Sequence, residues 1–304
     1  MLVTRPDDFL QAWRALPAEP WGPATARGAM LMAPDGLSAA AVTRADNRYM
    51  DPGRRIDAAR LHTQHRSLAQ ALARELPVWI FPGDASTPDA TFLNNAFATV
   101  PGRLILGAMR YPERQRETAR ADVRGFFRDV LGYEETDLSG QGCTAELTGS
   151  LVIDRRRGVG FCGLGERCDL AGAHAMHAAF GLRLTFAFAL APGEYHTNVV
   201  MSVLGGRTLV LCAQGLADAA VAGALRAAYG DQVVELSPGE KNAFAGNCIA
   251  LREGTVWMSA GAAAALAPGT GTRLAALGWS LRSVPLDEIE KAGGSLRCCV
   301  AELY

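Results

Sequence analysis

The stretch Asn198-Val199-Val200-Met201-Ser202-Val203-Leu204-Gly205-Gly206-Arg207-Thr208-Leu209-Val210 contains the pattern that decides the fold. An amide residue is followed by an apolar run, a polar turn with glycines, and a second apolar run. Glycine between two apolar runs is typical of a β-hairpin, because it adopts the positive φ angles of tight hairpin turns. A helical stretch at 216–229 and a short strand at 232–236 follow, which predicts a unit of the form ββαβ.

The same pattern recurs along the chain at a nearly constant spacing. Its first residues stand at positions 95, 150, 198 and 247, in steps of 55, 48 and 49, and a further step of 51 reaches Cys298. Sequence periods of this size are typical of radial or stacked repeats. The other hairpins are also followed by a helical stretch and a short strand, at 112–131 with 134–138, 170–180 with 183–188, and 260–277 with 279–284.

Five such units predict an α/β fold, a five-bladed α/β propeller of ββαβ repeats around a pseudo-fivefold axis. One unit would be split, with a helix at 54–76, a strand at 78–81, and residues 30–32 paired with the terminal strand at 299–303. A closed ring leaves no exposed sheet edge. The alternative is an open α/β sheet, whose βαβ crossovers do not need a hairpin in every unit.

In such a ring the first residue of each unit faces the central axis. We therefore expect one pocket to be surrounded by Asn95, Ser150, Asn198, Asn247 and Cys298.

Composition and charge indicate a soluble globular protein, which we interpret as a single catalytic domain over residues 1–304. The 304 residues are 49% hydrophobic with a net charge of -1, and no basic stripe suggests nucleic-acid binding. No apolar run reaches the ~18 residues of a membrane span. Seven cysteines without repeated pair spacing, and no signal peptide, favour a reduced cytoplasmic location.

A cysteine, a histidine and a glutamate stand at or shortly before the first residues of three different units. Cys298 follows a glycine turn, and a thiol is a strong nucleophile although only a small fraction is ionised at neutral pH. His196 comes two residues before Asn198, at the rim where Cys298 is expected, and a nearby imidazole or bound cation raises the thiolate fraction. Glu146 precedes Ser150 by four residues and could orient an imidazole.

Metal and cofactor sites are not expected. Cys168, His174 and His177 lack a fourth ligand and zinc-like spacing. The glycine-rich segments at 163–165 and 293–294 lack the strand, loop and helix context of a phosphate-binding loop.

Five motifs in this order resemble the guanidino-group modifying (pentein) superfamily, whose members are five-bladed α/β propellers. The superfamily includes arginine deiminase, dimethylarginine dimethylaminohydrolase and the amidinotransferases, and the resemblance runs from about residue 80 to the end. The residues of the motifs are most similar to those of the arginine deiminase-related branch, which is associated with citrulline hydrolysis. The motifs are Pro88-Asp89-Ala90-Thr91-Phe92-Leu93-Asn94-Asn95, Glu146-Leu147-Thr148-Gly149-Ser150, Gly163-Leu164-Gly165-Glu166-Arg167, Tyr195-His196-Thr197-Asn198-Val199 and Gly293-Gly294-Ser295-Leu296-Arg297-Cys298.

The resemblance implies a role for each site residue. Cys298 is the nucleophile, His196 the general acid and base, and Glu146 its acidic partner. Arg114 and Arg167 correspond to arginines that hold the substrate carboxylate in bidentate geometry. The further candidates for substrate binding are Asp89, Asn94, Asn95, Asn247 and the backbone of Ala292. The implied ligand is a small guanidino or ureido amino acid, without cofactor or metal, and a homodimer is left open.

Asn95 departs from the pattern of the superfamily and bears on the substrate. Deiminases and dimethylarginine hydrolases place a carboxylate there, which can pair with a cationic guanidinium. An amide cannot neutralise a buried cation, but it offers a donor and an acceptor to a neutral ureido group. We therefore favour hydrolysis of citrulline-type substrates, or of arginine through citrulline to ornithine. An arginine deiminase, a dimethylarginine dimethylaminohydrolase, an amidinotransferase and a non-catalytic binding protein remain alternatives.

Overall fold

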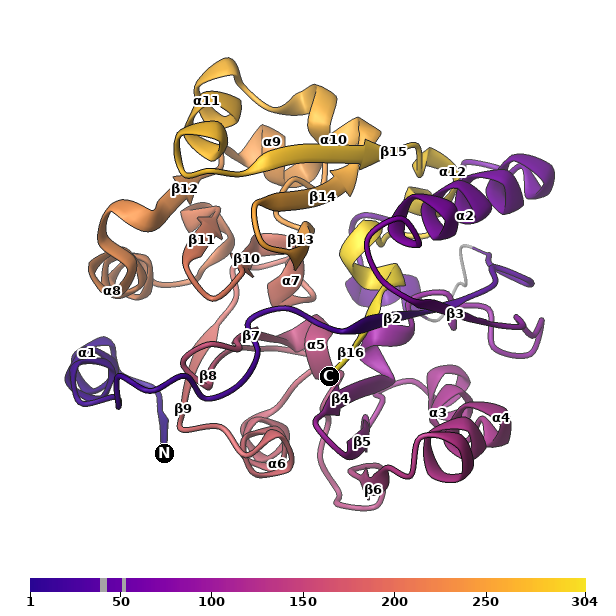
Figure 1. Ribbon diagram of the computed structural model, residues 1–304, viewed down its shortest axis with the longest axis horizontal. Helices are drawn as coiled ribbons and strands as arrows, with labels where there is room; N and C mark the ends of the chain where they lie inside the picture. The colour runs from indigo at the N-terminus through magenta and orange to yellow at the C-terminus, as the bar shows by residue number, and fades with distance from the viewer. Residues whose placement is uncertain (39–42, 51–52) are drawn as a thin grey trace.

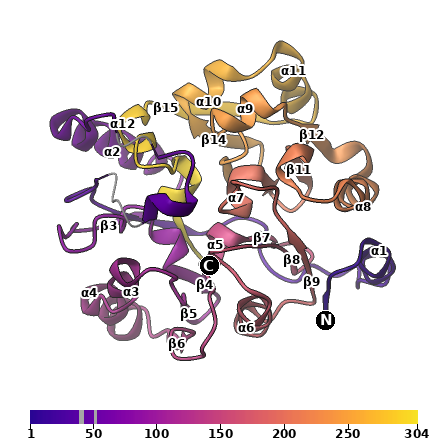
Figure 2. The ribbon, with the colours of Figure 1, turned by 180° about the vertical axis from the view of Figure 1, so that it is seen from behind.

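Five small β-sheets lie around the centre of the molecule, and most of the helices lie outside them (Figures 1 and 2). The computed structural model describes residues 1–38, 43–50 and 53–304. In each sheet a central strand pairs antiparallel with one neighbouring strand and parallel with the other. The mixed α/β class expected from the sequence is confirmed.

The hairpin that opened the sequence analysis shows how local chemistry builds one sheet. β10 (Met201–Leu204) pairs antiparallel with β11 (Thr208–Leu211), and β11 pairs in parallel with β12 (Val233–Glu235). Gly205 and Gly206 connect the hairpin with φ angles of 55° and 62°, which residues with a side chain rarely adopt.

Three further sheets repeat this topology. Their strands are β4 (Phe97–Val100), β5 (Arg103–Leu106) and β6 (Glu134–Asp137); β7 (Leu151–Asp154), β8 (Val159–Leu164) and β9 (Leu184–Ala189); and β13 (Ile249–Arg252), β14 (Thr255–Ser259) and β15 (Ser280–Val284).

The fifth sheet joins the two ends of the chain. β16 (Ala301–Leu303) pairs antiparallel with β2 (Gly28–Met32), and β2 pairs in parallel with β3 (Val78–Phe81). The terminal strand pairs with β2 as predicted, but its register is shifted: β16 stands opposite residues 28–30, so that only Met30 of the predicted residues 30–32 is paired with it. The segment before β2 was not predicted. β1 (Leu2–Val3) adds a fourth strand beside β9, and α1 (Pro6–Arg14) places Phe9 against Phe186.

The longer helices follow the predicted stretches, with one correction. The stretch 112–131 is broken at Arg120, whose ψ angle is 103° and whose guanidinium donates to the carbonyl of Pro82. This contact is distant in sequence, so periodicity could not reveal it. The helices are α2 (Ala58–Leu72), α3 (Pro112–Thr118), α4 (Ala121–Gly125), α6 (Leu170–Phe180), α8 (Ala219–Tyr229), α9 (Pro238–Asn242), α10 (Ala260–Ala265), α11 (Pro268–Ala276) and α12 (Asp287–Glu290).

Short helical turns precede the inner strands and hold most of the residues that begin the repeat. The strands start one to three residues later than the sequence pattern suggested. The turns are η2 (Leu93–Asn95), α5 (Leu147–Ser150), α7 (Thr197–Val200) and η6 (Leu296–Cys299). Their polar side chains are buried, with Glu146 fully buried and His196 only 1% exposed. A buried polar centre inside apolar sheets is unusual and indicates a functional site.

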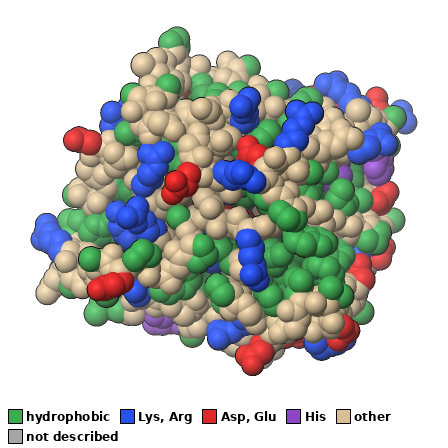
Figure 3. Space-filling view, viewed as in Figure 1, with side chains coloured by type: hydrophobic (Ala, Val, Ile, Leu, Met, Phe, Trp, Pro, Cys, Tyr) green, Lys and Arg blue, Asp and Glu red, His purple; other side chains and the backbone are tan. Residues whose placement is uncertain are grey.

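Lysine and arginine side chains are spread among apolar and acidic ones on the face shown in Figure 3, and they form no continuous stripe there. Across the residues that the structure describes, no helix has the length and apolar character needed to cross a membrane.

Candidate active site

A small cavity of about 20 Å³ lies among the central turns. Its walls include six residues predicted from the sequence: Asp89, Asn95, Arg114, Arg167, Ala292 and Cys298. Sequence reasoning missed the rest of the lining: Asn47, Met50, Phe92, Tyr195 and Gly293. Asn47 and Met50 belong to the segment 43–50, which contacts Gly293 and Ala292. The cavity has room for about one water molecule, so an amino acid can enter only if this covering moves.

Cys298 is held by two asparagines from neighbouring units. Asn247 Nδ2 donates to Cys298 Sγ over 3.2 Å, and Sγ lies 3.8 Å from Asn198 Oδ1. The backbone NH of Cys298 donates to Asn247 Oδ1 at 3.4 Å. Burial raises the pKa of the Cys298 thiol, although the hydrogen bonds to Ser295 and Asn247 oppose this effect. The sulfur is therefore mainly a thiol at neutral pH, and it needs a nearby cation or base to become a nucleophile.

His196 and Glu146 form a buried pair. His196 Nε2 lies 3.0 Å from Glu146 Oε2, and Nδ1 has no hydrogen-bond partner among the described residues. Burial lowers the pKa of His196 even though Glu146 favours the charged form. A neutral His196 therefore carries its proton on Nε2 toward Glu146 and presents the lone pair of Nδ1. No hydrogen bond joins His196 to Cys298 in the described part of the chain, so a substrate would have to connect the two groups.

Two arginines keep Glu146 ionised. Arg167 Nη1 lies 3.2 Å and Arg114 Nη1 lies 3.3 Å from Glu146 Oε2. Burial alone would raise the pKa of Glu146, but Arg167, His196 and Arg114 together hold it well below its usual range. Glu146 is therefore an anion across the physiological pH range and can stabilise an imidazolium at His196.

The same arginines are also bound by outer carboxylates. Arg114 forms two hydrogen bonds of 2.9 Å with Glu117, and Arg167 forms two of 2.6 Å with Asp46. Both arginine side chains are buried. The predicted role in binding a substrate carboxylate stays a prediction, and in this structure it requires a substrate to compete with Asp46 or Glu117. Glu117 stands three residues after Arg114, a spacing that could have revealed the pair.

The other predicted residues separate into two groups. Asn198 and Asn247 contact each other and Cys298. Asn94 faces away from the cavity and donates to Thr148 Oγ1, while Ser150 donates to the backbone carbonyl of Arg167. Of the five residues expected around one pocket, only Asn95 and Cys298 line the cavity. Asn198 and Asn247 lie behind Cys298 and contact its sulfur, and the hydroxyl of Ser150 satisfies a buried carbonyl instead.

Gly149 provides the space in which Asn95 and His196 meet. A Cβ atom on Gly149 would lie 2.4 Å from Asn95 Oδ1 and 2.9 Å from His196 Nδ1. Gly149→Ala is therefore expected to displace both side chains and reduce kcat roughly 10²-fold or more, as misplacement of about 1 Å does elsewhere. Steady-state kinetics would measure this, with Gly165→Ala as the control because its Cβ would meet no atom within 4 Å. Equal activity of Gly149→Ala and Gly165→Ala would contradict the assignment of Asn95 and His196 to the active site.

Solved structures share the fold. The N-terminal domain of ArgZ, an arginine dihydrolase of the cyanobacterial ornithine-ammonia cycle, aligns with a TM-score of 0.80 and 20% identity, over 91% of this chain and 97% of that domain. The dimethylarginine dimethylaminohydrolase (DDAH) of Pseudomonas aeruginosa, in complex with citrulline, aligns with a TM-score of 0.72 and 19% identity, over 92% and 100% of the chains. This likeness shows that the chain has the same fold as these two proteins.

Sequence comparison then gives the family. The model described as N,N dimethylarginine dimethylhydrolase, eukaryotic, matches residues 33–304, and the chain belongs to this family. The N(G),N(G)-dimethylarginine dimethylaminohydrolase of Mycobacterium tuberculosis is 25% identical over 269 residues, which cover 87% of this chain and 82% of that protein. The protein is thus a hydrolase that acts on C–N bonds of guanidino groups, as the sequence predicted.

Proposed function

We propose that the protein hydrolyses the C–N bond of arginine- and citrulline-type amino acids through a covalent intermediate on Cys298, with ornithine as the final product. Asn95 is the observation that carries this proposal. Its side chain lines the cavity beside Cys298, and its Oδ1 has no hydrogen-bond partner among the residues described. A buried amide oxygen without a partner is costly, and an N–H of a ureido group would satisfy it. The fold also carries arginine dihydrolase activity in ArgZ.

The geometry supports a two-stage mechanism. With the substrate bound between the two groups, the Cys298 thiol gives its proton to neutral His196, and the resulting thiolate attacks the central carbon. The imidazolium of His196 then gives this proton to the departing nitrogen, so that ammonia leaves. Neutral His196 then takes a proton from water, whose oxygen attacks the same carbon, and the C–S bond breaks to restore the thiolate. Arginine gives citrulline in this way. Citrulline gives a carbamate, which loses carbon dioxide to leave ornithine. Glu146 stabilises the imidazolium in both stages.

The proposal is tested by identifying products. Purified protein is incubated separately with arginine, citrulline and asymmetric dimethylarginine, and the amino-acid products are identified by mass. We expect ornithine from citrulline and from arginine. Citrulline as the terminal product of arginine, with no turnover of added citrulline, would contradict the role of Asn95.

A matched pair of variants tests how the side-chain amide of Asn95 affects substrate preference. Asn95→Asp places a carboxylate beside the reacting carbon, which favours a cationic guanidinium over a neutral ureido group. We expect the ratio of citrulline to arginine turnover to fall at least about tenfold, since an unpaired buried polar group costs roughly 1–3 kcal/mol. Asn242→Asp is the control, because Asn242 is exposed and contacts Arg48 away from the cavity. An unchanged ratio in Asn95→Asp would reject the specificity argument.

A second candidate is hydrolysis of methylated arginine to citrulline. The family match and the mycobacterial relative favour it, and Asp89 supplies a carboxylate in the cavity wall that could pair with a guanidinium. In the product assay it predicts dimethylamine and citrulline from dimethylarginine. The family match favours both hydrolytic activities over the amidinotransferase and the non-catalytic binding protein.

We further infer that the five sheets are the blades of a closed propeller and form a single catalytic domain. The support is the repeated topology and the contacts between inner strands of adjacent sheets, β16 with β4, β7 with β10, and β10 with β13. A cytoplasmic location and a homodimer stay predictions.

A further inference from the structure

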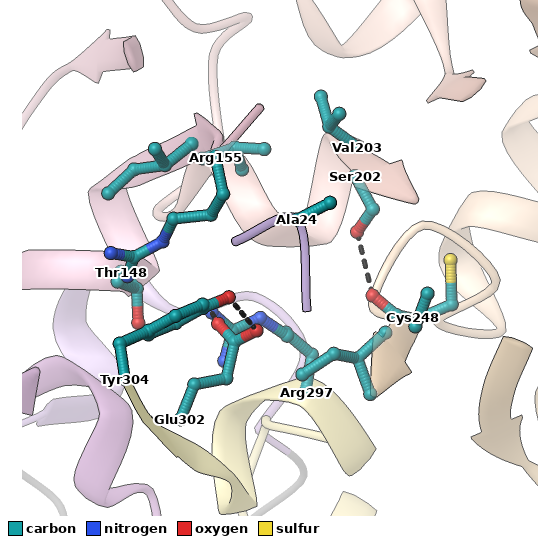
Figure 4. A pocket seen from close by; sticks show the side chains of 13 residues that line it. Ala24, Thr148, Arg155, Ser202, Val203, Cys248, Arg297, Glu302 and Tyr304 are labelled. Atoms are coloured by element: carbon teal, nitrogen blue, oxygen red, sulfur yellow. Dashed lines mark hydrogen bonds and ion pairs between the residues drawn. The ribbon is translucent and has the colours of Figure 1, made fainter. Parts of the chain in front are cut away.

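A second pocket lies among Arg155, Ser202, Arg297 and Tyr304, and Cys298 does not line it (Figure 4). Thr148 and Arg297 contribute to its wall, whereas their chain neighbours Gly149 and Cys298 belong to the catalytic site. Its volume is about 40 Å³, and its polar lining comes mainly from Arg155, Ser202, Arg297, Glu302 and Tyr304. We refer to it as the rear pocket. None of these five side chains takes part in the proposed reaction.

Most polar groups of the rear pocket are already paired. Arg297 Nη2 donates to Glu302 Oε2 at 2.9 Å, and its Nη1 donates to the carbonyl of Val300 at 2.8 Å. The hydroxyl of Tyr304 donates to Glu302 Oε1 at 2.8 Å. Ser202 Oγ lies within hydrogen-bond distance of two backbone carbonyls. Arg297 and Glu302 therefore neutralise each other.

Arg155 is the exception. Arg155 is only 5% exposed, and no ion pair within 4.0 Å joins its guanidinium to an Asp or Glu side chain in the described ranges of the chain. The guanidinium packs over the ring of Tyr304 with its central carbon 4.0 Å from the ring centroid. Nη1 donates to the carbonyl of Thr99 at 3.1 Å, whereas Nε is buried without an acceptor among the described residues. A buried cation that lacks an anion is strongly unfavourable, because burial removes the hydration that stabilises the charge.

We propose that the rear pocket binds a small monovalent anion, such as a halide or formate, which pairs with Arg155. The three charged side chains in the wall, Arg155, Arg297 and Glu302, leave an excess of one positive charge. The pocket exceeds the roughly 10–15 Å³ that a water molecule requires, so a small anion fits but an amino acid does not. The planar guanidinium donates readily to a halide or a carboxylate.

The anion would join segments that are distant in sequence. Arg155 follows β7, whereas Arg297 and Tyr304 belong to the terminal segment that also carries Cys298. An anion that binds the folded protein and not the unfolded chain shifts the equilibrium toward the folded state. An anion in the rear pocket would therefore stabilise the packing of the terminal segment against the sheet that contains β7.

Thermal unfolding tests the proposal directly. The Tm is followed as chloride or formate replaces gluconate, a monovalent anion too large for the pocket, at constant ionic strength. For the wild-type protein we expect a rise of roughly 2–4 °C. Arg155→Gln should abolish the rise, while Arg66→Gln, at an exposed site on α2, should retain it. Equal responses of the wild type and Arg155→Gln would overturn the proposal, because the effect would then arise from general salt effects.

Two further measurements keep the test decisive if Arg155→Gln folds poorly. Ala24 lies in the wall of the rear pocket (Figure 4), and Ala24→Asp is expected to supply the negative charge itself and remove the dependence of Tm on chloride. Crystals soaked in bromide should show an anomalous peak beside the Arg155 guanidinium. No peak there would contradict the proposal, and so would full chloride dependence in Ala24→Asp. None of these readouts requires turnover, so they stand independently of the proposed reaction.

Discussion

Replacing Cys298 with serine is expected to lower turnover on the order of 10⁴-fold or more while leaving the fold intact, as loss of the nucleophile does in other covalent hydrolases. A serine hydroxyl loses its proton far less readily than a thiol, and the atoms that contact Cys298 Sγ are side-chain amides of Asn247 and Asn198. An amide cannot act as a base for a hydroxyl, so a serine would remain protonated. Stopped assays of ammonia release would measure the loss.

Cys299 offers a matched control in the next position. It is equally buried, but its side chain packs in the apolar cluster of Leu31 and Leu296 and does not line the catalytic cavity. Cys299→Ala should therefore retain most of the activity at some cost in stability. Mass spectrometry should detect an adduct on Cys298 in the wild type during turnover. Near-normal turnover by Cys298→Ser would remove Cys298 from the mechanism.

Glu146→Gln is expected to lower the free energy of unfolding by roughly 3–5 kcal/mol and to abolish most activity. The amide cannot accept from Arg114, Arg167 and His196 as the carboxylate does, and its NH₂ group would face donors. Urea unfolding followed by fluorescence would measure the loss. Glu166→Gln is the control, because Glu166 is exposed and its ion pair with Arg110 is worth about 1 kcal/mol or less. Equal stability losses in the two variants would contradict a buried charge cluster at Glu146.

The pH dependence of the free energy of unfolding should follow from the buried pair of Glu146 and His196. The folded state lowers the pKa of Glu146, so its contribution is complete above the ordinary glutamate value of about 4.3 and is lost as the pH falls below it. The folded state also lowers the pKa of His196, whose contribution is likewise lost on acidification from about 6.5. Wild-type stability should therefore decrease from neutral to acidic pH, and Glu146→Gln should show a shallower decrease below about pH 4.3.

The repeat could be predicted because hairpins are encoded locally. Gly205 and Gly206 indicate a turn whatever the rest of the chain does, and the apolar runs on either side define the strands. The pairing of β2 with the terminal strand followed from the count of repeats, although its register did not. By contrast, the position of α1 beside β9 could not be predicted, because it depends on which apolar surface the folded sheets leave uncovered.

The residues of the candidate site also divide into those that the sequence could predict and those that only the folded structure reveals. Cys298 stands at a repeat start and His196 two residues before another, so the spacing of the chain could find them, whereas the role of Glu146 followed from the family resemblance. The carboxylate of Asp46 reaches Arg167 across 121 positions and stands in no repeated motif, so only the folded chain reveals it. The rear pocket depends on Arg155 forming no ion pair within the described residues, which the sequence cannot indicate, because Asp154 stands directly before Arg155 but pairs with Arg157.

The short turns before the inner strands have a consequence for how the enzyme becomes active. Asn95, Glu146, His196, Asn247 and Cys298 each precede the first strand of a different sheet. No fragment with fewer than five sheets contains the complete set, and the contacts that hold these residues join positions 50, 51 and 100 residues apart. Contacts of such long range form slowly during folding. Recovery of activity on refolding would thus report the last stage of assembly, after hairpins and helices have already formed.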